Sequence, residues 1–185
     1  MAEAVDKTEK QEKAKKNKED KSTTDEAQEA VDIDENQYLS FELDQEYYCV
    51  DILRVQEILG YTEMTRVPNT PEFVKGVLNL RGAIVPVVDL RSRFSLTKTD
   101  LGKATVIVVL AVKTANREKV VGIIVDAVSD VLNISKNDIK PVPETGTKVE
   151  TEFLTGLGSS DSRMVMIMNI DNLLDPDQFM GTAIQ

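Results

Sequence analysis

The side chains that most often perform enzyme chemistry are scarce in this sequence. It contains no histidine, so no Ser-His or Cys-His nucleophile can be assembled, and the commonest metal ligand is missing. The single cysteine, Cys49, excludes an internal disulfide and is predicted to be a small buried hydrophobe in a strand. Gly156-Leu-Gly158 is followed by Ser-Ser-Asp-Ser, which does not match a phosphate-binding loop. The residue types therefore predict no catalytic, metal or cofactor site.

One pair of residues is better suited to recognition than to catalysis. Arg81 lies in Asn79-Leu-Arg-Gly82 between two predicted strands, where Gly82 can adopt the positive φ of a tight turn. Arg81 should project from this turn, either as a solvated residue or as a binding residue held by a carboxylate. Glu57 is the expected carboxylate, within about 4 Å, because a guanidinium can bind it bidentately. Alternatively, Glu57 is an ordinary residue on the polar side of an alternating strand.

The charge of the chain limits the class of partner. The formal net charge is −10, which argues against nucleic acid because phosphate binding needs a dense cationic patch. A cluster of Arg81, Arg91 and Arg93 leaves polyanion binding as the weaker alternative. Residues 1–36 hold twelve acidic residues and seven lysines, and no aromatic residue precedes Tyr38. This segment is predicted to be a disordered tail because it cannot bury enough apolar surface to offset the entropy of ordering.

Neither membrane insertion nor secretion is predicted. No uninterrupted apolar run approaches the length of a membrane span, and the first 22 residues lack the apolar region of a signal peptide. A cytoplasmic location is expected, and a lone cysteine fits a reducing compartment.

The body of the chain is predicted to be mostly β. Short β-branched runs separated by polar turns pair as four hairpins: residues 38–43 with 47–52, 74–80 with 84–90, 105–112 with 120–125, and 153–157 with 164–170. Pro86 predicts an edge position or a bulge in its strand. Single helical turns capped by Asp are predicted at 89–94 and 171–174, and another turn at 53–57.

Internal repetition is the strongest organisational signal. Segments of the first half recur in the same order in the second: Val50-Asp51 with Val55–Leu59 as Val125-Asp126 with Val128–Leu132, Val67-Pro68 as Val142-Pro143, Phe73–Val77 as Phe153–Leu157, and Ala83–Leu90 as Met164–Asp171. The repeats predict two modules of about five short strands, which usually close into barrels because closure removes exposed edges. Either module alone would be marginally stable, so a shared core is expected. Exchange of strands between the modules stays open.

From about Gln37 to Leu174 the sequence resembles the CheW coupling proteins of bacterial chemotaxis. The resemblance is carried by residues 50–60 (VDILRVQEILG), 73–82 (FVKGVLNLRG), 84–90 (IVPVVDL) and 121–132 (VGIIVDAVSDVL). It implies two similar five-stranded Src-homology-like β-barrel subdomains packed around a shared hydrophobic core, with a few short helices. The expected organisation is a charged tail (1–36), a CheW-like domain (37–174, with repeat halves at about 37–95 and 104–174) and a C-terminal extension (175–185).

The resemblance also implies a function. The chain would be a non-enzymatic adaptor that couples the histidine kinase CheA to the cytoplasmic hairpin tips of chemoreceptors, in membrane-associated receptor arrays. The regulatory domain of CheA resembles CheW itself, so the two are expected to pair pseudo-symmetrically through apolar residues at barrel ends. Neither a cofactor nor direct membrane insertion is expected, and the isolated chain should be a monomer.

By the same resemblance, the receptor-binding residues include Val55, Glu57, Lys75, Gly76, Asn79 and Arg81. The missing side chain of Gly76 would let a receptor helix approach closely. Helical hairpins dock best in apolar grooves. The second wall of such a groove is predicted to contain four valines, each of which could equally belong to the core: Val106, Val108, Val121 and Val128.

Two other functional classes are retained. An isolated kinase-regulatory module would need only one binding surface and would not bridge to receptors. A hydrolase built on Asp and Glu would need a deep pocket with paired carboxylates of strongly shifted pKa.

Overall fold

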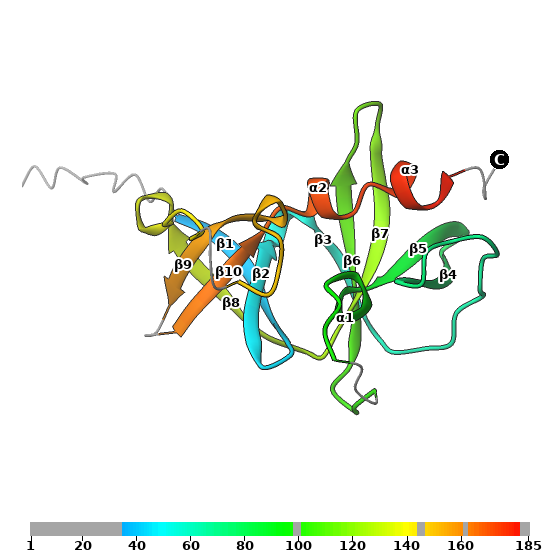
Figure 1. The fold of residues 1–185 in the computed structure, drawn as a ribbon, viewed down its shortest axis with the longest axis horizontal. Coiled ribbons are helices and arrows are strands. Elements are labelled where there is room, and N and C mark those ends of the chain that lie inside the picture. Colours follow the sequence, from blue (N-terminus) through cyan, green and yellow to red (C-terminus); the bar gives the residue numbers. More distant parts are fainter. Residues whose placement is uncertain (1–34, 98–100, 144–146, 161–162, 182–185) are drawn as a thin grey trace, which may run out of the picture. The chain divides into compact units, whose positions relative to one another are not determined.

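The computed structural model describes residues 35–97, 101–143, 147–160 and 163–181, and within them the strands form two five-stranded sheets (Figure 1). Sheet A has the strand order β8-β1-β2-β10-β9, and sheet B has the order β3-β6-β7-β5-β4. The strands of sheet A are β1 (Glu35–Leu43), β2 (Glu46–Asp51), β8 (Ala127–Ser135), β9 (Leu154–Ser160) and β10 (Arg163–Met168). Those of sheet B are β3 (Val55–Gly60), β4 (Val74–Leu80), β5 (Ala83–Asp89), β6 (Val106–Lys113) and β7 (Glu118–Val125). The mostly β fold and the four hairpins are confirmed.

Most of the predicted charged tail, residues 1–34, lies outside the described residues. The last two residues of the predicted tail belong to β1, which begins at Glu35 and pairs with β8 from that residue onward.

Two hairpins owe their tight turns to left-handed backbone. β1 and β2 are joined by Asp44 and Gln45, with φ of 52° and 66°, and β4 and β5 by Arg81 and Gly82, with φ of 52° and 88°. Positive φ at both central residues gives the turn a twist that matches the right-handed twist of the flanking strands. Both turns therefore fix the register of their strands.

The two repeat halves exchange strands. Each sheet takes its first and second strands from one half and its third, fourth and fifth strands from the other. The second and fifth strands meet in parallel in both sheets, with Met166 opposite Tyr48 in sheet A and Val87 opposite Gly122 in sheet B. Figure 1 shows this as cyan β2 beside orange β10. The halves therefore interlock, and neither sheet corresponds to one half of the sequence.

The strand registers correct two of the predicted repeat matches. Leu78 lies opposite Val85 and Gly158 lies opposite Val165, so Ala83–Leu90 matches the second half one residue earlier than predicted. Cys49 lies beside Ile167 in sheet A, and Gly122 lies beside Val87 in sheet B, so Cys49 and Gly122 are equivalent. Val50-Asp51 therefore matches a pair of residues that lies two positions earlier than predicted. After this correction the Val50-Asp51 match has the same offset as the Val55–Leu59 match, so no residue is inserted between β2 and β3 relative to the second half.

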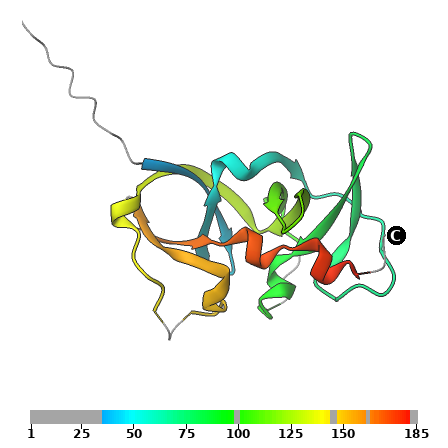
Figure 2. The same cartoon turned by 90° about the horizontal axis from the view of Figure 1, so that it is seen from above.

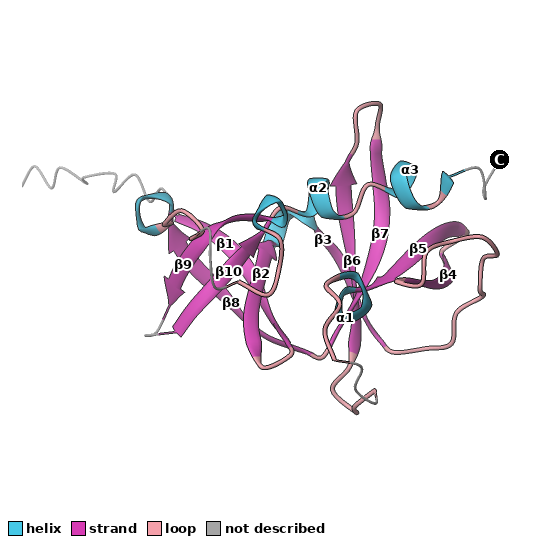
Figure 3. Cartoon of the chain, viewed as in Figure 1, coloured by secondary structure: helices cyan, strands magenta, loops and turns pink. Residues whose placement is uncertain are grey.

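The helices within the described ranges are single turns (Figure 3). They are η1 (Ile52–Arg54), α1 (Leu90–Arg93), η2 (Lys136–Asp138), η3 (Thr151–Phe153), α2 (Ile170–Leu173) and α3 (Pro176–Phe179). The turn predicted over 53–57 is wrong beyond Arg54, because β3 begins at Val55. Asp89 caps α1 as predicted, but the side chain that caps α2 is Asn169 and not Asp171.

The largest hydrophobic cluster is shared by both sheets, as predicted. It contains Phe41 and Tyr48 from sheet A, Val108 and Ile123 from sheet B, and Phe179 from the C-terminal segment. Two smaller clusters fill the concave faces of sheet A and sheet B. Because Phe179 is buried, the packed body continues beyond the boundary predicted at Leu174. Figure 2 shows the segment that carries α2 and α3 running from sheet A along sheet B.

Each sheet curls round on itself. The segment that follows the third strand of a repeat half, β3 or β8, folds back against the fourth strand of that half, β4 or β9. Thr65, after β3, forms a bridge with Val77 of β4, and Lys140, after β8, forms the equivalent bridge with Leu157 of β9. These closures agree with the predicted barrels. Pro86 does not lie on an edge strand, but β5 pairs with β7 only from Val87 onward.

Candidate functional site

The predicted ion pair between Glu57 and Arg81 is confirmed. The Nη2 atom of Arg81 lies 3.2 Å from the Oε2 atom of Glu57, and the two side chains are 83% and 27% exposed. Glu57 lies on β3 and Arg81 in the β4–β5 turn, and β3 and β4 are the opposite edges of sheet B. The pair therefore spans the line along which this sheet closes.

The turn that carries Arg81 is preorganised. The Oδ1 atom of Asn79 accepts a hydrogen bond from the backbone N–H of Gly82 at 2.9 Å. Arg81 itself has a φ of 52°, a conformation that costs a residue with a Cβ about 1–2 kcal/mol. The same backbone conformation occurs at Asp44 in the β1–β2 turn, so it fixes the turn but does not by itself distinguish a binding residue from a solvated one.

Lys75 and Gly76 hold the first half together. The Nζ atom of Lys75 lies 3.2 Å from the Oδ2 atom of Asp89 and donates to Ser92 at 3.0 Å. Gly76 is buried, and a Cβ placed on it would lie 2.4 Å from the carbonyl oxygen of Thr65. The space left by the missing side chain is therefore occupied by the chain's own backbone, and the expected close approach of a partner helix at Gly76 is wrong.

The four valines predicted for a groove wall divide into two groups. Val108 and Val121 have no exposed surface and belong to the shared core, so they cannot contact a partner and the core alternative is correct for them. Val106 and Val128 are partly buried and pack against the same core from its margin, as does Val55. Of the five valines predicted to bind the receptor, these three keep surface that a partner can reach.

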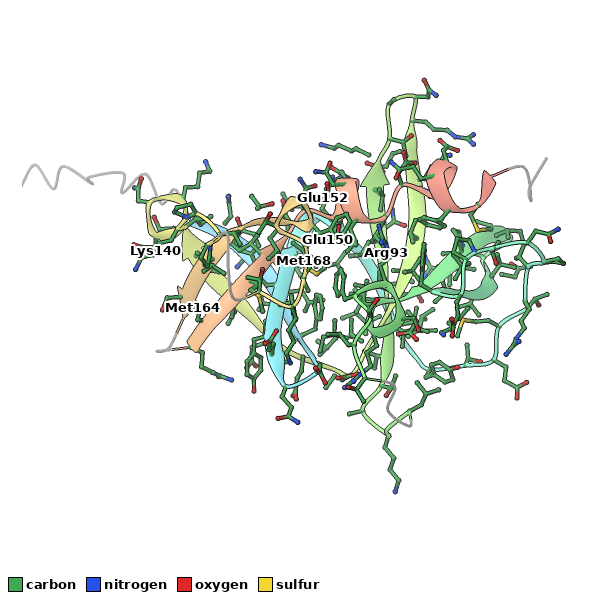
Figure 4. The ribbon with its side chains drawn as sticks, viewed as in Figure 1. Arg93, Lys140, Glu150, Glu152, Met164 and Met168 are labelled. Carbon is green, nitrogen blue, oxygen red and sulfur yellow. The ribbon has the colours of Figure 1, made fainter. Side chains whose placement is uncertain are left out.

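The three arginines proposed as a polyanion-binding patch lie in different surroundings. The Nη2 atom of Arg91 lies 2.6 Å from Asp126, and its Nη1 atom lies 3.3 Å from Asp44. The guanidinium of Arg93 lies over the ring of Phe73 at 5.0 Å and that of Phe153 at 4.7 Å (Figure 4). Arg81 is thus the exposed member of the three, and they do not form a shared cationic surface.

Sequence reasoning missed several large apolar side chains that are exposed at corresponding places in the two sheets. Ile84 of β5 is 56% exposed opposite Asn79, and Met164 of β10 is 68% exposed opposite Ser159 (Figure 4). Ile58 of β3 and Val131 of β8 are also exposed and occupy matching positions in the repeat. The repeat in correct register would have identified all four as equivalent pairs.

Cys49 is a free cysteine that is buried among apolar residues of sheet A. Burial raises the pKa of the Cys49 thiol to about 12, so the thiol is protonated and unreactive at neutral pH. Among the described residues, no group of three or more His, Cys, Asp or Glu could hold a metal ion. None of the helices in the described ranges is long and apolar enough to cross a membrane.

Two interlocked five-stranded sheets with a strained, charged turn and matched apolar positions define a protein-binding adaptor module. The family model of the CheW-like domain matches residues 37–178, and the chain belongs to this family. The chemotaxis protein CheW of Klebsiella aerogenes is 46% identical over 142 residues, which are 77% of this chain and 83% of that protein. A probable chemotaxis protein CheW of Rhizobium etli is 37% identical over 75% of this chain and 87% of its own length.

A solved structure agrees with this assignment. The crystal structure of the scaffolding protein TtCheW from Thermoanaerobacter tengcongensis matches with a TM-score of 0.69 at 35% sequence identity, and the match covers 76% of this chain and 88% of that chain. The resemblance seen in the sequence is therefore confirmed at the level of family and fold.

Proposed function

We propose that this chain is a non-enzymatic adaptor that couples the histidine kinase CheA to the cytoplasmic hairpin tips of chemoreceptors. The observation that carries the proposal is the strained turn of Arg81, which is fixed by Asn79 and ion-paired with Glu57. A guanidinium held in this way is rigid yet largely exposed, which lowers the entropy lost when a partner binds. Membership of the CheW-like family supports the choice of CheA and chemoreceptors as the partners.

The receptor tip would contact the face of sheet B that carries this turn. A helical hairpin presents polar groups beside a narrow apolar stripe, and the proposed face offers a matching mixture. Arg81 supplies the fixed charge, and the partly buried Val55 and Val106 of sheet B supply the apolar margin, which Val128 of sheet A extends across the shared core. The receptor would thus be recognised by a few rigid residues at the edge of the core.

The kinase would bind elsewhere, through exposed apolar side chains. Val131 and Met164 of sheet A are 49% and 68% exposed, and neither belongs to the sheet that carries Arg81. Large apolar side chains in such positions are typical anchors of protein interfaces. Two surfaces on different sheets allow both partners to be held at once, which a bridging adaptor requires.

The proposal places the chain in the cytoplasm. It would reach membrane-associated arrays by binding the receptors and not by inserting into the bilayer, and it would be a monomer when isolated. No reaction is assigned to it, so calorimetric titration with ATP or zinc should give no site-specific heat.

Co-sedimentation with receptor-containing membranes, with and without CheA, tests the proposal. The chain should sediment with receptors alone, and CheA should sediment with receptors only when the chain is added. Met164→Glu should abolish recruitment of CheA while the chain still sediments. Sedimentation of the chain only when CheA is present would instead identify a kinase-regulatory module that does not bridge to receptors.

A further inference from the structure

Two ion-pair clamps hold the places where the chain crosses between the sheets. Arg91, the second residue of α1, binds Asp126 bidentately, with Nε donating to Oδ1 at 2.8 Å and Nη2 to Oδ2 at 2.6 Å. Asp126 is the residue that connects β7 of sheet B to β8 of sheet A. On the other crossing, Asp171, the second residue of α2, accepts a hydrogen bond from Nη2 of Arg54. Arg54 immediately precedes β3, where the chain passes from sheet A to sheet B.

Each clamp also holds the first hairpin of its own half. The Nη1 atom of Arg91 donates to Asp44 in the β1–β2 turn at 3.3 Å. The Oδ1 atom of Asp171 accepts from the backbone N–H of Lys113, at the end of β6, at 2.7 Å. The side chains of Arg91 and Arg54 are only 16% and 15% exposed, whereas those of Asp126 and Asp171 are 29% and 35% exposed, so both pairs are partly shielded from water.

The helical-turn residues of the two clamps occupy equivalent positions, the crossing residues lie one position apart in the repeat, and the clamps have opposite polarity. Asp89 caps α1 and Asn169 caps α2, so Arg91 and Asp171 are equivalent residues two positions after their caps. The first half presents a cation at this position and the second half an anion. At the crossings the signs are reversed again, with Arg54 in the first half and Asp126 in the second. A first half and a second half are therefore matched at both clamps.

We propose that these clamps form a recognition code that lets a half of this fold pair only with the complementary half. If two first halves from separate copies interlocked, Arg91 would face Arg54 of the other copy. If two second halves interlocked, Asp171 would face Asp126. Like charges that are partly shielded from water repel each other, so the code rejects a like half without weakening the correct pairing.

Reversing one clamp tests the code in the full chain. Arg54→Asp alone places two carboxylates together and should raise the equilibrium constant for unfolding at least about tenfold. Adding Asp171→Arg restores an attractive pair and should recover most of that loss. The neutral variant R54Q/D171N serves as the control for loss of the pair without repulsion, and it should fall between the two.

The double variant R54D/D171R also makes like halves compatible, because Arg91 can then pair with an aspartate of another first half. After refolding at high protein concentration, it should yield several-fold more exchanged dimer by sedimentation velocity than the wild type does. R91D/D126R reverses the other clamp and carries the same expectation if the first variant folds poorly. No recovery of stability in either double variant, or recovery without additional dimer, would overturn the proposal.

Discussion

Sheet A and sheet B have the same topology, yet only sheet B carries the charged turn. In sheet B the bridge at Thr65, the buried Gly76 and the Glu57–Arg81 pair lie together along the closure. Sheet A repeats the bridge at Lys140 and the buried Gly156. Its sequence, however, has acidic residues where the ion pair should be: Asp130 corresponds to Glu57, and Asp161, which lies outside the described residues, corresponds to Arg81. Packing thus preserves the shared fold, whereas a few surface residues confine the charged turn, which is the proposed receptor contact, to sheet B.

The largest expected effect separates the two buried glycines. A Cβ at Gly76 would lie 2.4 Å from a backbone oxygen at a φ of +153°, whereas one at Gly156 would first meet the side-chain methyl of Ile139 at 2.5 Å and then the Lys140 carbonyl oxygen at 2.9 Å. Backbone cannot retreat as a methyl can, so Gly76→Ala should cost about 3 kcal/mol and Gly156→Ala about 1–2 kcal/mol. Urea unfolding measures both.

Gly60→Ala is the control, because a Cβ at Gly60 meets nothing within 4 Å. It should change the free energy of unfolding by no more than about 0.5 kcal/mol. Equal losses at Gly76 and Gly156 would show that the two closures tolerate an added Cβ equally well.

The next effect concerns binding, not stability. Arg81→Ala should weaken receptor binding more than tenfold, about 2 kcal/mol, because it removes a rigid anchor. Its ion pair is exposed and should contribute only about 0.2–1 kcal/mol to folding, so the melting temperature should barely move. Receptor co-sedimentation and thermal unfolding measure the two quantities.

Arg163 provides the matched control for Arg81, since it begins β10 in the corresponding hairpin of sheet A and stacks over Tyr47. Arg163→Ala should leave receptor binding unchanged. A double-mutant cycle of Arg81→Ala with Glu57→Ala would show whether the two residues act as one unit. Unchanged receptor binding in Arg81→Ala would mean that the charged turn is not the recognition site.

A smaller effect on stability is expected when the charge of Asp44, in the β1–β2 turn of sheet A, is removed. In the β1–β2 turn, a hydrogen bond from Lys148, together with the charges of Lys148 and Arg91, lowers the pKa of Asp44 below its usual 3.8. A carboxyl with a lowered folded-state pKa adds stability above that usual value and loses it as the pH falls through the folded-state pKa. Asp44→Asn should therefore be less stable than the wild type at pH 7, and the difference should shrink below pH 3.8.

Chemical denaturation at pH 7 and at low pH measures this convergence. Asp130→Asn, which changes an exposed carboxylate on β8 of the same sheet, is the control and should show little difference at either pH. A difference between Asp44→Asn and the wild type that persists unchanged at low pH would mean that the Asp44 charge is not its cause.

The smallest effect is expected at Cys49, which occupies the interior of sheet A where sheet B has Gly122. Because burial raises its thiol pKa to about 12, the folded protein should not react with iodoacetamide at pH 8, and Cys49→Ala should leave binding unchanged. Mass spectrometry after labelling in buffer and in urea checks this. Rapid labelling without denaturant would show that sheet A opens readily.

Much of the fold could be predicted because its signals are local. Alternation of apolar and polar residues identified both strands of each hairpin, and Gly82 located the turn that positions Arg81. The Glu57–Arg81 pair was also predictable once family resemblance pointed to its residues. The third strands, by contrast, were not placed, and β3 was partly taken for a helical turn. Burial alternates regularly along β3, but the residue types do not, because Glu57 lies on the partly buried side and Ile58 on the exposed side.

The amino-acid sequence alone determined the duplicated pattern, the absence of histidine chemistry and the family. Only the tertiary structure decided that the halves exchange strands, that Val108 and Val121 are core residues, and that the space at Gly76 is filled by Thr65. The physical reason is that periodicity records that a face is buried but not which segment covers it. The covering segment comes from the other half of the chain for most of this core, so long-range packing alone distinguishes a binding groove from an interior.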